Sequence, residues 1–464
     1  MSSRTLLVGG LGRARDLLAV AALRAGGVEA ALLPAPSDAG LERARALGNH
    51  GQCNPAHYAV GQVLEHASGK DAGELARTHA WLVPGSCGPC RLAAFPLEWQ
   101  RVLDRAGLGA LEVQLLDQLA VVPAIDRACG SRPPGFGLVA ALVAGDVLEQ
   151  LALSLRPYVT SPASLDAAFS AAADEVAAAV AERRGLAAPL RAAAARLSAL
   201  DTERDRVLPR VLVTGEPWTT LAGGAPAYDA AARLAELGAE LEAPRLVDWL
   251  RALCWQRSRE RRVEPADRRA AVRAVRTLGA LWRRLAAAAG LPTALDEPDV
   301  LAALTAPWYP AEVKGGSAHL ELGRALGAAS THAAHLVLSL KPFGCLPSSA
   351  LSDGIVGPLL RRLDRAPAFL ALETTGDAHA TADSRLELAL HAATLRALGE
   401  LEVACAARGL EPAAARRRLA VRPTTSLSGP RTFACTAAER VARGEADVDR
   451  DVPPRADQLA VGEC

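Results

Sequence analysis

The stretch "TLLVGGLGRARDLL" (residues 5–18) decides the expected fold, because an apolar run ends in a glycine-rich turn and continues into an amphipathic segment. It predicts a strand over 5–10 and a helix over 13–25, and "VEAALLP" (28–34) predicts a second strand. A strand–helix–strand opening is typical of Rossmann-like α/β folds. The glycines do not match the full dinucleotide-binding fingerprint, so the turn indicates tight packing more than a bound nucleotide.

The same pattern returns further along the chain. Strands are expected in "AWLV" (80–83), "RVLVTGEPW" (210–218), "AAHLVLSLKPFG" (333–344) and "AFLALETTGD" (368–377), with helices over 92–106, 138–200, 227–237 and 244–290. Pro96 should disturb the first turns of its helix, and Ser164 is the expected N-cap of an alanine-rich one. We therefore expect an α/β fold with parallel sheets in two Rossmann-like lobes. The predicted divisions are a first lobe (1–137), an Ala/Arg-rich helical connecting section (138–206), a second α/β lobe (207–435) and a loose C-terminal tail (436–464).

Composition excludes several classes of protein. The 464 residues are 50% hydrophobic and 22% charged, with a formal net charge of +1, which gives no electrostatic reason to expect nucleic acid or an anionic membrane as partner. The N-terminus lacks the longer apolar core of a secretory signal, and no charge-free apolar run is long enough for a membrane span. Nine cysteines without export indicate reduced thiols or metal ligands, and a cytoplasmic location.

Three of the cysteine-bearing stretches share one design, in which a cysteine lies in a turn before an expected helix or just after an expected strand. They contain Cys53, the pair Cys87 and Cys90 in "PGSCGPCR" (84–91), and Cys345. Loops that follow parallel strands gather at one edge of a sheet, where ligands bind. Backbone N–H groups and helix N-termini at such turns favour a thiolate or an anionic cluster. Cys254, Cys405 and Cys435 are interpreted as small buried hydrophobes, whereas Cys129 lies in another glycine- and proline-containing turn.

Several chemistries fit these thiols. The C-x-x-C pair alone is compatible with a thioredoxin-like dithiol, but that site needs no partner cysteines in other turns. A structural zinc site usually has two closely spaced ligand pairs, and this chain offers one pair and two singles. Thiolates that converge from several loops favour an iron–sulfur cluster.

Five stretches resemble the 2-hydroxyacyl-CoA dehydratase and benzoyl-CoA reductase superfamily. They are "GNHGQCNPAHYAVGQVL" (48–64), "PGSCGPCR" (84–91), "GGSAHLELGRAL" (315–326), "LSLKPFGCLPSSALSDGI" (338–355) and "LETTGDAHATADSRLELAL" (372–390). The resemblance is closest to the dehydratase-like branch that is associated with acyl-CoA dehydratase activases. It implies Rossmann-like lobes around an iron–sulfur cluster, typically [4Fe-4S], between them.

The family's ligand pattern carries over residue by residue. Cys53 and Cys87 lie 34 positions apart (87 − 53) in the first lobe and Cys345 follows in the second, as the resemblance implies for cluster ligands. Cys90 belongs to the "CGPCR" form of the activase-associated branch, as a fourth ligand or a nearby thiol. In the dehydratases one iron has no cysteine ligand, so a fourth cysteine favours electron transfer over dehydration. Ser317 and Ala318 depart from the acidic residue and glycine usual before His319.

The resemblance implies low-potential electron transfer, coupled to an ATP-hydrolysing activase of the actin-like fold that is encoded separately. A homologous dehydratase-like subunit and an acyl-CoA substrate are further expected partners. Three alternatives remain: a 2-hydroxyacyl-CoA dehydratase subunit with an open-site cluster, a non-catalytic cluster scaffold or structural relative, and a dithiol oxidoreductase.

Polar residues near the cysteines complete the candidate site. His319, Glu321 and Glu373 are candidates for proton transfer, with capping and packing as the alternative roles. Lys341, His50 and Glu216 are candidate cofactor-binding residues around the cluster, and His50 and His57 flank Cys53. The alternatives are that Lys341 is an ordinary strand-end lysine, that His50 is exposed, and that Glu216 only accepts backbone hydrogen bonds.

Overall fold

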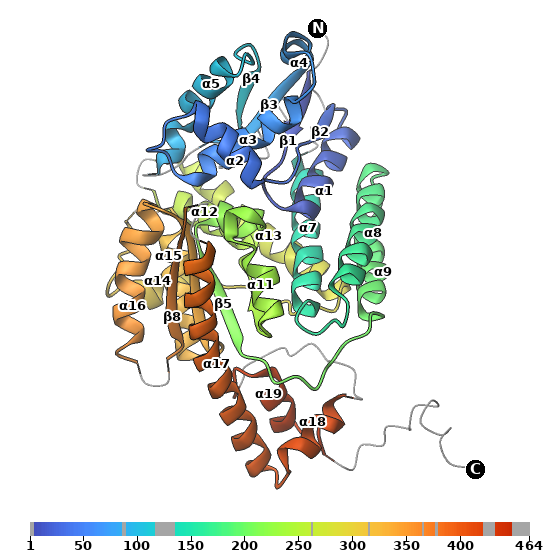
Figure 1. Cartoon of the computed structure of the whole chain (residues 1–464), viewed down its shortest axis with the longest axis vertical. Helices are drawn as coiled ribbons and strands as arrows, with labels where there is room; N and C mark the ends of the chain where they lie inside the picture. The colour runs from blue at the N-terminus through green and yellow to red at the C-terminus, as the bar shows by residue number, and fades with distance from the viewer. Residues whose placement is uncertain are drawn as a thin grey trace, which may run out of the picture.

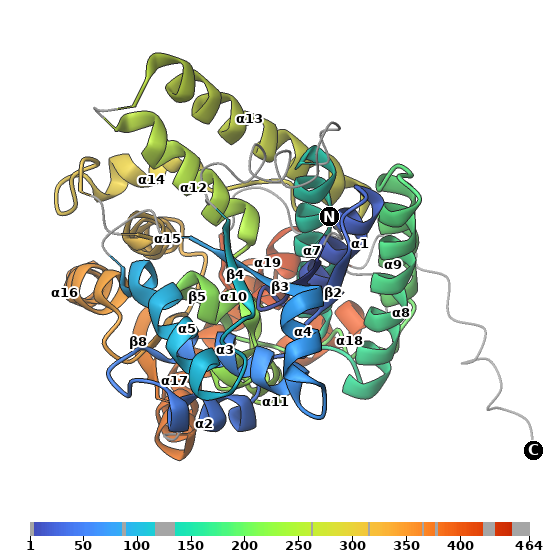
Figure 2. The same cartoon turned by 90° about the horizontal axis from the view of Figure 1, so that it is seen from above.

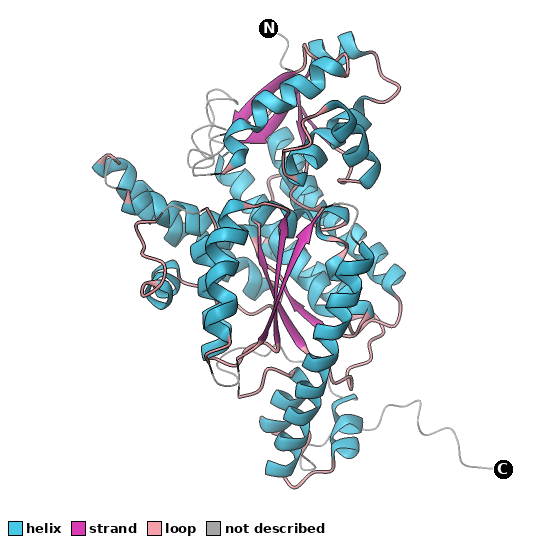
Figure 3. Cartoon of the chain, turned by 60° about the vertical axis from the view of Figure 1, so that its left-hand side comes forward, coloured by secondary structure: helices cyan, strands magenta, loops and turns pink. Residues whose placement is uncertain are grey.

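The computed structural model describes residues 4–85, 90–116, 135–260, 263–313, 316–363, 366–375, 379–420 and 432–447. Two four-stranded parallel sheets, each covered by helices, form the mixed α/β architecture (Figure 1). Figure 3 shows the sheets in separate layers of the molecule, with helices on both faces of the second sheet. The parallel α/β fold class predicted from the sequence is confirmed at this level.

The first sheet has the strand order β2-β1-β3-β4. Its strands are β1 (Thr5–Val8), β2 (Ala30–Leu32), β3 (His79–Pro84) and β4 (Glu112–Leu116). The helices of this part are α1 (Arg13–Ala25), α2 (Asp38–Leu47), α3 (Asn54–Ala67), α4 (Ala72–Thr78) and α5 (Phe95–Arg105), with the 3₁₀ turn η1 (Arg91–Ala94). Pro96 lies in the first turn of α5, and the preceding turn is 3₁₀, which agrees with the expected disturbance there.

The second sheet repeats this order as β6-β5-β7-β8. Its strands are β5 (Arg210–Gly215), β6 (Glu240–Glu242), β7 (Leu336–Pro342) and β8 (Ala368–Thr374). The surrounding elements are α10 (Pro217–Ala222), η2 (Ala225–Ala227), α11 (Ala230–Glu236), α12 (Leu246–Arg259), α13 (Pro265–Ala288), α14 (Pro298–Thr305), α15 (Ala318–Ser330), the π-helical segment η3 (Leu346–Asp353), α16 (Gly354–Leu360) and α17 (His379–Ala407). On β6, Glu242 forms ion pairs with Arg210 and, at 3.2 Å, with Arg324.

The strand order places a topological switch point in each sheet, between β1 and β3 and between β5 and β7. At a switch point, the loops after two neighbouring strands leave in opposite directions and open a crevice, which is where ligands bind in such folds. In the second lobe those loops begin with Glu216 and lead to Cys345, and in the first lobe the loop after β3 leads to Cys90. The fold thus brings two of the predicted cysteines to equivalent loops of the two sheets.

The glycine-rich turn after β1 is filled by the protein itself. The carboxylate of Asp16 accepts hydrogen bonds from the backbone N–H of Gly10 at 2.9 Å and of Leu11 at 3.0 and 3.1 Å. Because these amides are the donors that would bind a phosphate, this arrangement agrees with the tight-packing interpretation of the turn. A Cβ on Gly12, where φ is +97°, would lie 2.8 Å from the carbonyl oxygen of Leu221 in the second lobe. The turn is therefore closely packed against α10.

The helical connecting section packs into the first lobe. It consists of α7 (Gly135–Leu155), α8 (Pro162–Ala181) and α9 (Ala187–Ser198), which share one hydrophobic core with α1 and α13. Figure 2 shows α7, α8 and α9 beside α1, and the pair α12 and α13 extending from the other side of α7. Ser161 caps α8 by accepting the N–H of Ser164, so the expected cap at Ser164 was three residues too late.

Helix α7 is the one described helix with the length and composition of a membrane span, over Gly137–Leu155, and 67% of that window is buried inside the protein. Its Asp146 is fully buried and pairs with Arg15 of α1 at 2.6 Å. The apolar surface of α7 is therefore used in the protein core.

The C-terminal elements α18 (Pro412–Ala420) and α19 (Thr436–Ala442) form a small core with the end of α17. The predicted loose tail from residue 436 is wrong at its start, because Ala438 and Val441 of α19 are fully buried in this core. Residues 448–464 of the predicted tail lie outside the described residues.

Candidate functional site

Cys53 lies at the junction of the two lobes, at the N-cap of α3. Pro55 occupies the first turn of this helix, as the sequence indicated. The neighbouring Asn54 is buried, and its side-chain amide donates a hydrogen bond to the carbonyl oxygen of Thr374 at the end of β8, at 2.8 Å. The start of α3 is thereby fixed to the carboxyl edge of the second sheet.

Cys90 is the N-cap of η1, and its Sγ accepts the backbone N–H of Leu92 at 3.4 Å. Cys90 is exposed, while Cys53 and Cys345 are half-buried, and all three are free thiols. Cys87, the other member of the C-x-x-C pair, lies outside the described residues, as does Cys129.

Cys345 follows β7 and is the N-cap of η3. Burial raises the pKa of its thiol, and the backbone N–H and hydroxyl of the nearby Ser348 oppose this rise. All three cysteines thus stand at the start of a helical segment, where unpaired N–H groups and the helix dipole favour negative charge.

These three thiols, which are remote in sequence, all interact electrostatically with one carboxylate. Burial is the main reason that the pKa of each thiol is raised, and repulsion from Glu216 is a further cause at all three positions. At Cys53 the pKa rises to about 12, with Cys90 as another source of repulsion. The thiols of Cys53, Cys90 and Cys345 are therefore all within electrostatic reach of Glu216, and Cys53 is within reach of Cys90.

Glu216 is held in this position by its own helix. Its carboxylate caps α10 by accepting the N–H of Trp218 at 2.9 Å and the N–H and hydroxyl of Thr219 at 2.7 and 2.8 Å. Burial raises its pKa, and these hydrogen bonds oppose the rise. The capping role considered for this residue is the one that the structure shows, and the cap places the carboxylate beside the thiols.

Arg91 joins the three cysteine loops. One guanidinium nitrogen donates to the carbonyl oxygen of Gly51 at 2.9 Å, and the other lies 3.6 Å from the position of a Cβ on Gly344. Because Gly51 and Gly344 stand next to the turns of Cys53 and Cys345, Arg91 brings a positive charge to the site. This charge lowers the pKa of Cys53 and Cys90, against burial and Glu216.

The thiols of this site are the donor type that iron–sulfur clusters take. Among the described residues, no three His, Cys, Asp or Glu side chains are close enough to hold one ion. A cluster is larger, so its thiolate ligands stand further apart, and it favours sulfur donors. Three thiols with helix N-termini and an arginine are suitable surroundings for an anionic cluster, and Cys53, Cys90 and Cys345 would hold it together with the loop of Cys87.

Lys341 is a buried cation behind Cys345. It is 1% exposed, forms an ion pair with Asp353 and donates to the hydroxyl of Ser339 at 3.2 Å. Burial lowers its pKa to about 8, while Glu321, Glu373 and Cys345 oppose this. Lys341 is therefore more than a solvated residue at the end of a strand, although its predicted role toward a cofactor stays a prediction.

The two predicted carboxylates of this edge are both held by serines of η3. Glu321, on α15, accepts hydrogen bonds from Ser317 and, at 2.9 Å, from Ser348. Glu373, at the end of β8, accepts a hydrogen bond from Ser349 at 2.8 Å.

The predicted histidines have other surroundings. His319 packs against Tyr309, with ring centroids 4.3 Å apart, and hydrogen-bonds the carbonyl oxygen of Val313 through Nε2 at 3.1 Å. His50 is exposed in the turn before Cys53. No contact between these histidines and a described cysteine is present.

Sequence analysis did not single out Arg91, Asn54, Ser348 or Asp353. All four lay inside quoted motifs, with Asn54 and Arg91 directly after cysteines and Ser348 three residues after Cys345, and this proximity was the available signal. The carbonyl partners of Asn54 and Arg91 come from distant segments, so only the fold reveals them.

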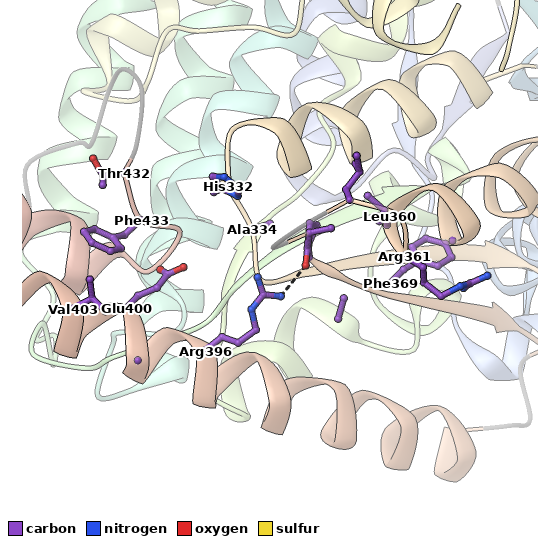
Figure 4. A pocket seen from close by; sticks show the side chains of 16 residues that line it. His332, Ala334, Leu360, Arg361, Phe369, Arg396, Glu400, Val403, Thr432 and Phe433 are labelled. Atoms are coloured by element: carbon purple, nitrogen blue, oxygen red, sulfur yellow. Dashed lines mark hydrogen bonds between the residues drawn. The ribbon is translucent and has the colours of Figure 1, made fainter. Parts of the chain in front are cut away.

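A separate cavity lies at the edge of the second sheet where β7 and β8 begin (Figure 4). It has a volume of about 790 Å³ and lies between α16, α17 and the segment before α19. Arg396 crosses its floor and donates to the carbonyl oxygen of Ala366 at 3.0 Å. Because Cys345 follows the opposite end of β7, this cavity is separate from the thiol site.

Comparison with known proteins leaves the site to be interpreted from its own chemistry. No protein-family model, no curated protein and no solved structure matches the chain.

Proposed function

We propose that this protein binds an iron–sulfur cluster, of the [4Fe-4S] type, between its two lobes. Cys53, Cys345 and the C-x-x-C loop with Cys87 and Cys90 hold the cluster. The observation that carries the proposal is the gathering of thiols from distant segments around Glu216 and Arg91. A bound cluster supplies one-electron chemistry, at a potential that the protein sets through charge, burial and hydrogen bonds to sulfur.

The chain's own residues have defined parts in this function. The N–H of Leu92 donates to the sulfur of Cys90, which stabilises negative charge there, and the polar groups of Ser348 lower the pKa of Cys345. Arg91 offsets part of the negative charge of the thiolates. The carboxylate of Glu216 repels that charge, so it makes the most negative state of the site less stable. These opposing charges suit a low-potential centre.

Electron transfer in acyl-CoA chemistry, in company with a separate ATP-hydrolysing activase, is the process that we propose for this centre. The resemblance of the cysteine-bearing motifs to the dehydratase superfamily supports the acyl-CoA part, and the place of Cys90 beside Cys53 supports transfer over dehydration. An exposed Cys90 also leaves the centre within reach of a redox partner at the surface.

Anaerobic purification and reconstitution with iron and sulfide test the proposal. We expect bound iron and sulfide in equal amounts and an EPR signal after reduction. Cys53→Ser and Cys345→Ser should lose most of the iron, whereas the matched control Cys254→Ser, a free half-buried cysteine packed against the α1–α7 core, should keep it. Absence of iron from the wild type, or full iron in both site variants, would refute the cluster.

Two further measurements separate the alternatives. Comparison of Cys87→Ser with Cys90→Ser shows which thiols of the loop are ligands, because loss of a ligand lowers iron content and loss of a neighbour only changes the EPR signal. Dehydration of a panel of 2-hydroxyacyl-CoA thioesters, with activase, ATP and reductant, would identify a dehydratase subunit instead. Dithiol oxidoreductase activity that depends on Cys87 and Cys90 alone would contradict both the electron-transfer function and the dehydratase function.

A further inference from the structure

Helix α17 is apolar on two opposite faces. One face carries Leu386, Leu390 and Leu401, which are buried in the cores of the second lobe and of the C-terminal elements. Figure 1 shows α17 along the outside of this lobe, and on its other face Leu388 is 74% exposed and Leu395 is 58% exposed. A helix with apolar residues all round is normally buried on all sides. The outward face of α17 is therefore the kind of surface that a second molecule covers.

Large and small residues alternate along this outward face. Four residues, at steps of four, three and four positions, form one row along the helix: Leu388, Ala392, Leu395 and Gly399. Ala392 is exposed and a Cβ on Gly399 would stand in open space, so the two small residues leave gaps beside the two leucines. Leu398 and Val403, which are 40% and 60% exposed, flank the row and widen its apolar surface.

This row is complementary to a copy of itself that runs in the opposite direction. When position 388 of one copy stands opposite position 399 of the other, position 395 stands opposite position 392, because both pairs share one midpoint between residues 393 and 394. Each leucine then enters a gap beside a small residue, which lets the two helices approach closely. A two-fold axis through the midpoint repeats every contact, as in isologous dimers. In a parallel two-fold pair leucine would meet leucine, and the gaps would stay empty.

Charged residues at the ends of the row agree with this alignment. Arg385 and Glu402 are both exposed, and the same midpoint brings Arg385 of one copy to the level of Glu402 of the other at each end. Glu387 and Glu400 also share that midpoint, but each is engaged within its own chain at 2.8 Å, by a guanidinium group and by a backbone N–H. The alignment therefore brings opposite charges near each other, which favours a second copy as the occupant of this face.

We propose that two copies of this chain associate through the outward face of α17, antiparallel, about a two-fold axis between residues 393 and 394. The inference is independent of the proposed cluster, because the cysteines that would hold it lie on other segments. From Leu388 to Val403 the face is about 23 Å long, and a helix is about 10 Å wide. Such a strip is smaller than the area of about 800 Å² that each partner buries in a standard interface. We therefore expect a reversible dimer that forms at micromolar concentrations.

Sedimentation equilibrium of the full chain, with a reductant present, measures this association from low to high micromolar concentration. We expect the wild type to pass from monomer to dimer, and Leu395→Glu to weaken the association at least tenfold, since it places a charge against the row of the second copy. The matched control is Leu97→Glu, because Leu97 is 72% exposed on α5 in the first lobe and should leave the association unchanged. Circular dichroism shows that both variants are folded.

A mixture of two variants tests the direction of the pairing. Ala392→Glu and Leu395→Lys should each self-associate more weakly than the wild type, because each places two like charges in the interface. An equimolar mixture should recover dimers, since the introduced carboxylate of one copy faces the introduced ammonium group of the other. The second contact of that mixed dimer keeps its native leucine and alanine. A parallel pair would not bring these two positions together.

The outcomes separate the possible occupants of the face. A wild type that stays monomeric throughout, or a Leu395→Glu variant that associates as the wild type does, overturns the inference. A mixture that stays monomeric overturns the antiparallel pairing. Vesicles of anionic lipid that bind the wild type but not Leu395→Glu, without any dimer, would assign the face to a membrane and overturn the inference as well. None of these results depends on bound iron, so the proposed function is tested separately.

Discussion

Substitution of Asp146 tests how the connecting helices hold the lobes together. Asp146 on α7 is fully buried and forms an ion pair with Arg15 of α1 at 2.6 Å. Its two carboxylate oxygens also accept the backbone N–H groups of Leu246 at 3.0 Å and Val247 at 2.8 Å, at the start of α12. One side chain therefore joins three helices, one of which belongs to the second lobe.

The expected cost of Asp146→Ala follows from these contacts. Removal of one partner of a buried ion pair costs about 3–5 kcal/mol, because the other charge stays buried. A buried N–H group that loses its acceptor costs about 1–3 kcal/mol. These contributions overlap, since the same side chain makes them, so we expect a loss of at least about 4 kcal/mol in the free energy of unfolding. Asp146→Asn keeps an acceptor oxygen and should lose less.

Urea unfolding followed by circular dichroism measures this loss. The matched control is Glu175→Ala, which removes an exposed ion pair with Arg196 on neighbouring helices and should cost less than about 1 kcal/mol. The reasoning is refuted if Asp146→Ala and Glu175→Ala unfold at the same urea concentration with the same slope.

Three other predictions concern the lobe contact, acid stability and helix packing. Asn54→Ala should cost about 1 kcal/mol, because the Thr374 carbonyl oxygen keeps only the N–H of Phe343 and Arg45 loses its Asn54 acceptor; iron retention after dilution should fall with it, and unchanged stability would contradict this. Burial opposes ionisation of Glu242, yet its two arginine partners lower its pKa to about 2 from an ordinary 4.5. The stabilisation it provides is therefore present above about pH 4.5 and is lost as the pH falls toward 2, so a pH series of urea midpoints should decline less steeply for Glu242→Gln than for the wild type. Gly61→Ala should destabilise by about 1–3 kcal/mol, because its Cβ would lie 2.5 Å from the Gly40 carbonyl oxygen. Gly399→Ala, in open space on α17, should stabilise by about 0.5–1 kcal/mol. Thermal unfolding midpoints that move in the same direction for both variants would refute the packing argument.

Apolar runs made most of the fold predictable. Strands β1, β2, β5, β7 and β8 lie within stretches that were expected to be strands, and β3 contains the expected stretch 80–83, because strands of parallel sheets need continuous apolar residues. The edge strands β4 and β6 were missed, since Glu112–Leu116 and Glu240–Glu242 are short and carry charged residues. The core shared by α1 and α7–α9 was also not evident, because alanine-rich helices show little contrast between their faces.

The candidate site was predictable in its parts but not in its assembly. The turns of Cys53 and Cys345 were identified because each cysteine precedes a proline-containing helix start, and such local signals are readable in a sequence. The electrostatic centre at Glu216, the ion pair of Lys341 with Asp353 and the bond from Asn54 to β8 depend on which loops meet across two sheets. The contacts between these loops follow from the order of the strands in the sheets, which cannot be derived from local sequence periodicity.

The self-contained turn after β1 has a consequence for how the first lobe behaves in the cell. With the Asp16 carboxyl group on the amides of Gly10 and Leu11, the turn carries its own hydrogen-bond acceptor, and burial raises the pKa of that group to about 7. The order of this turn therefore needs no phosphate from outside the chain. Removal of the Asp16 side chain would leave the two amides without this acceptor.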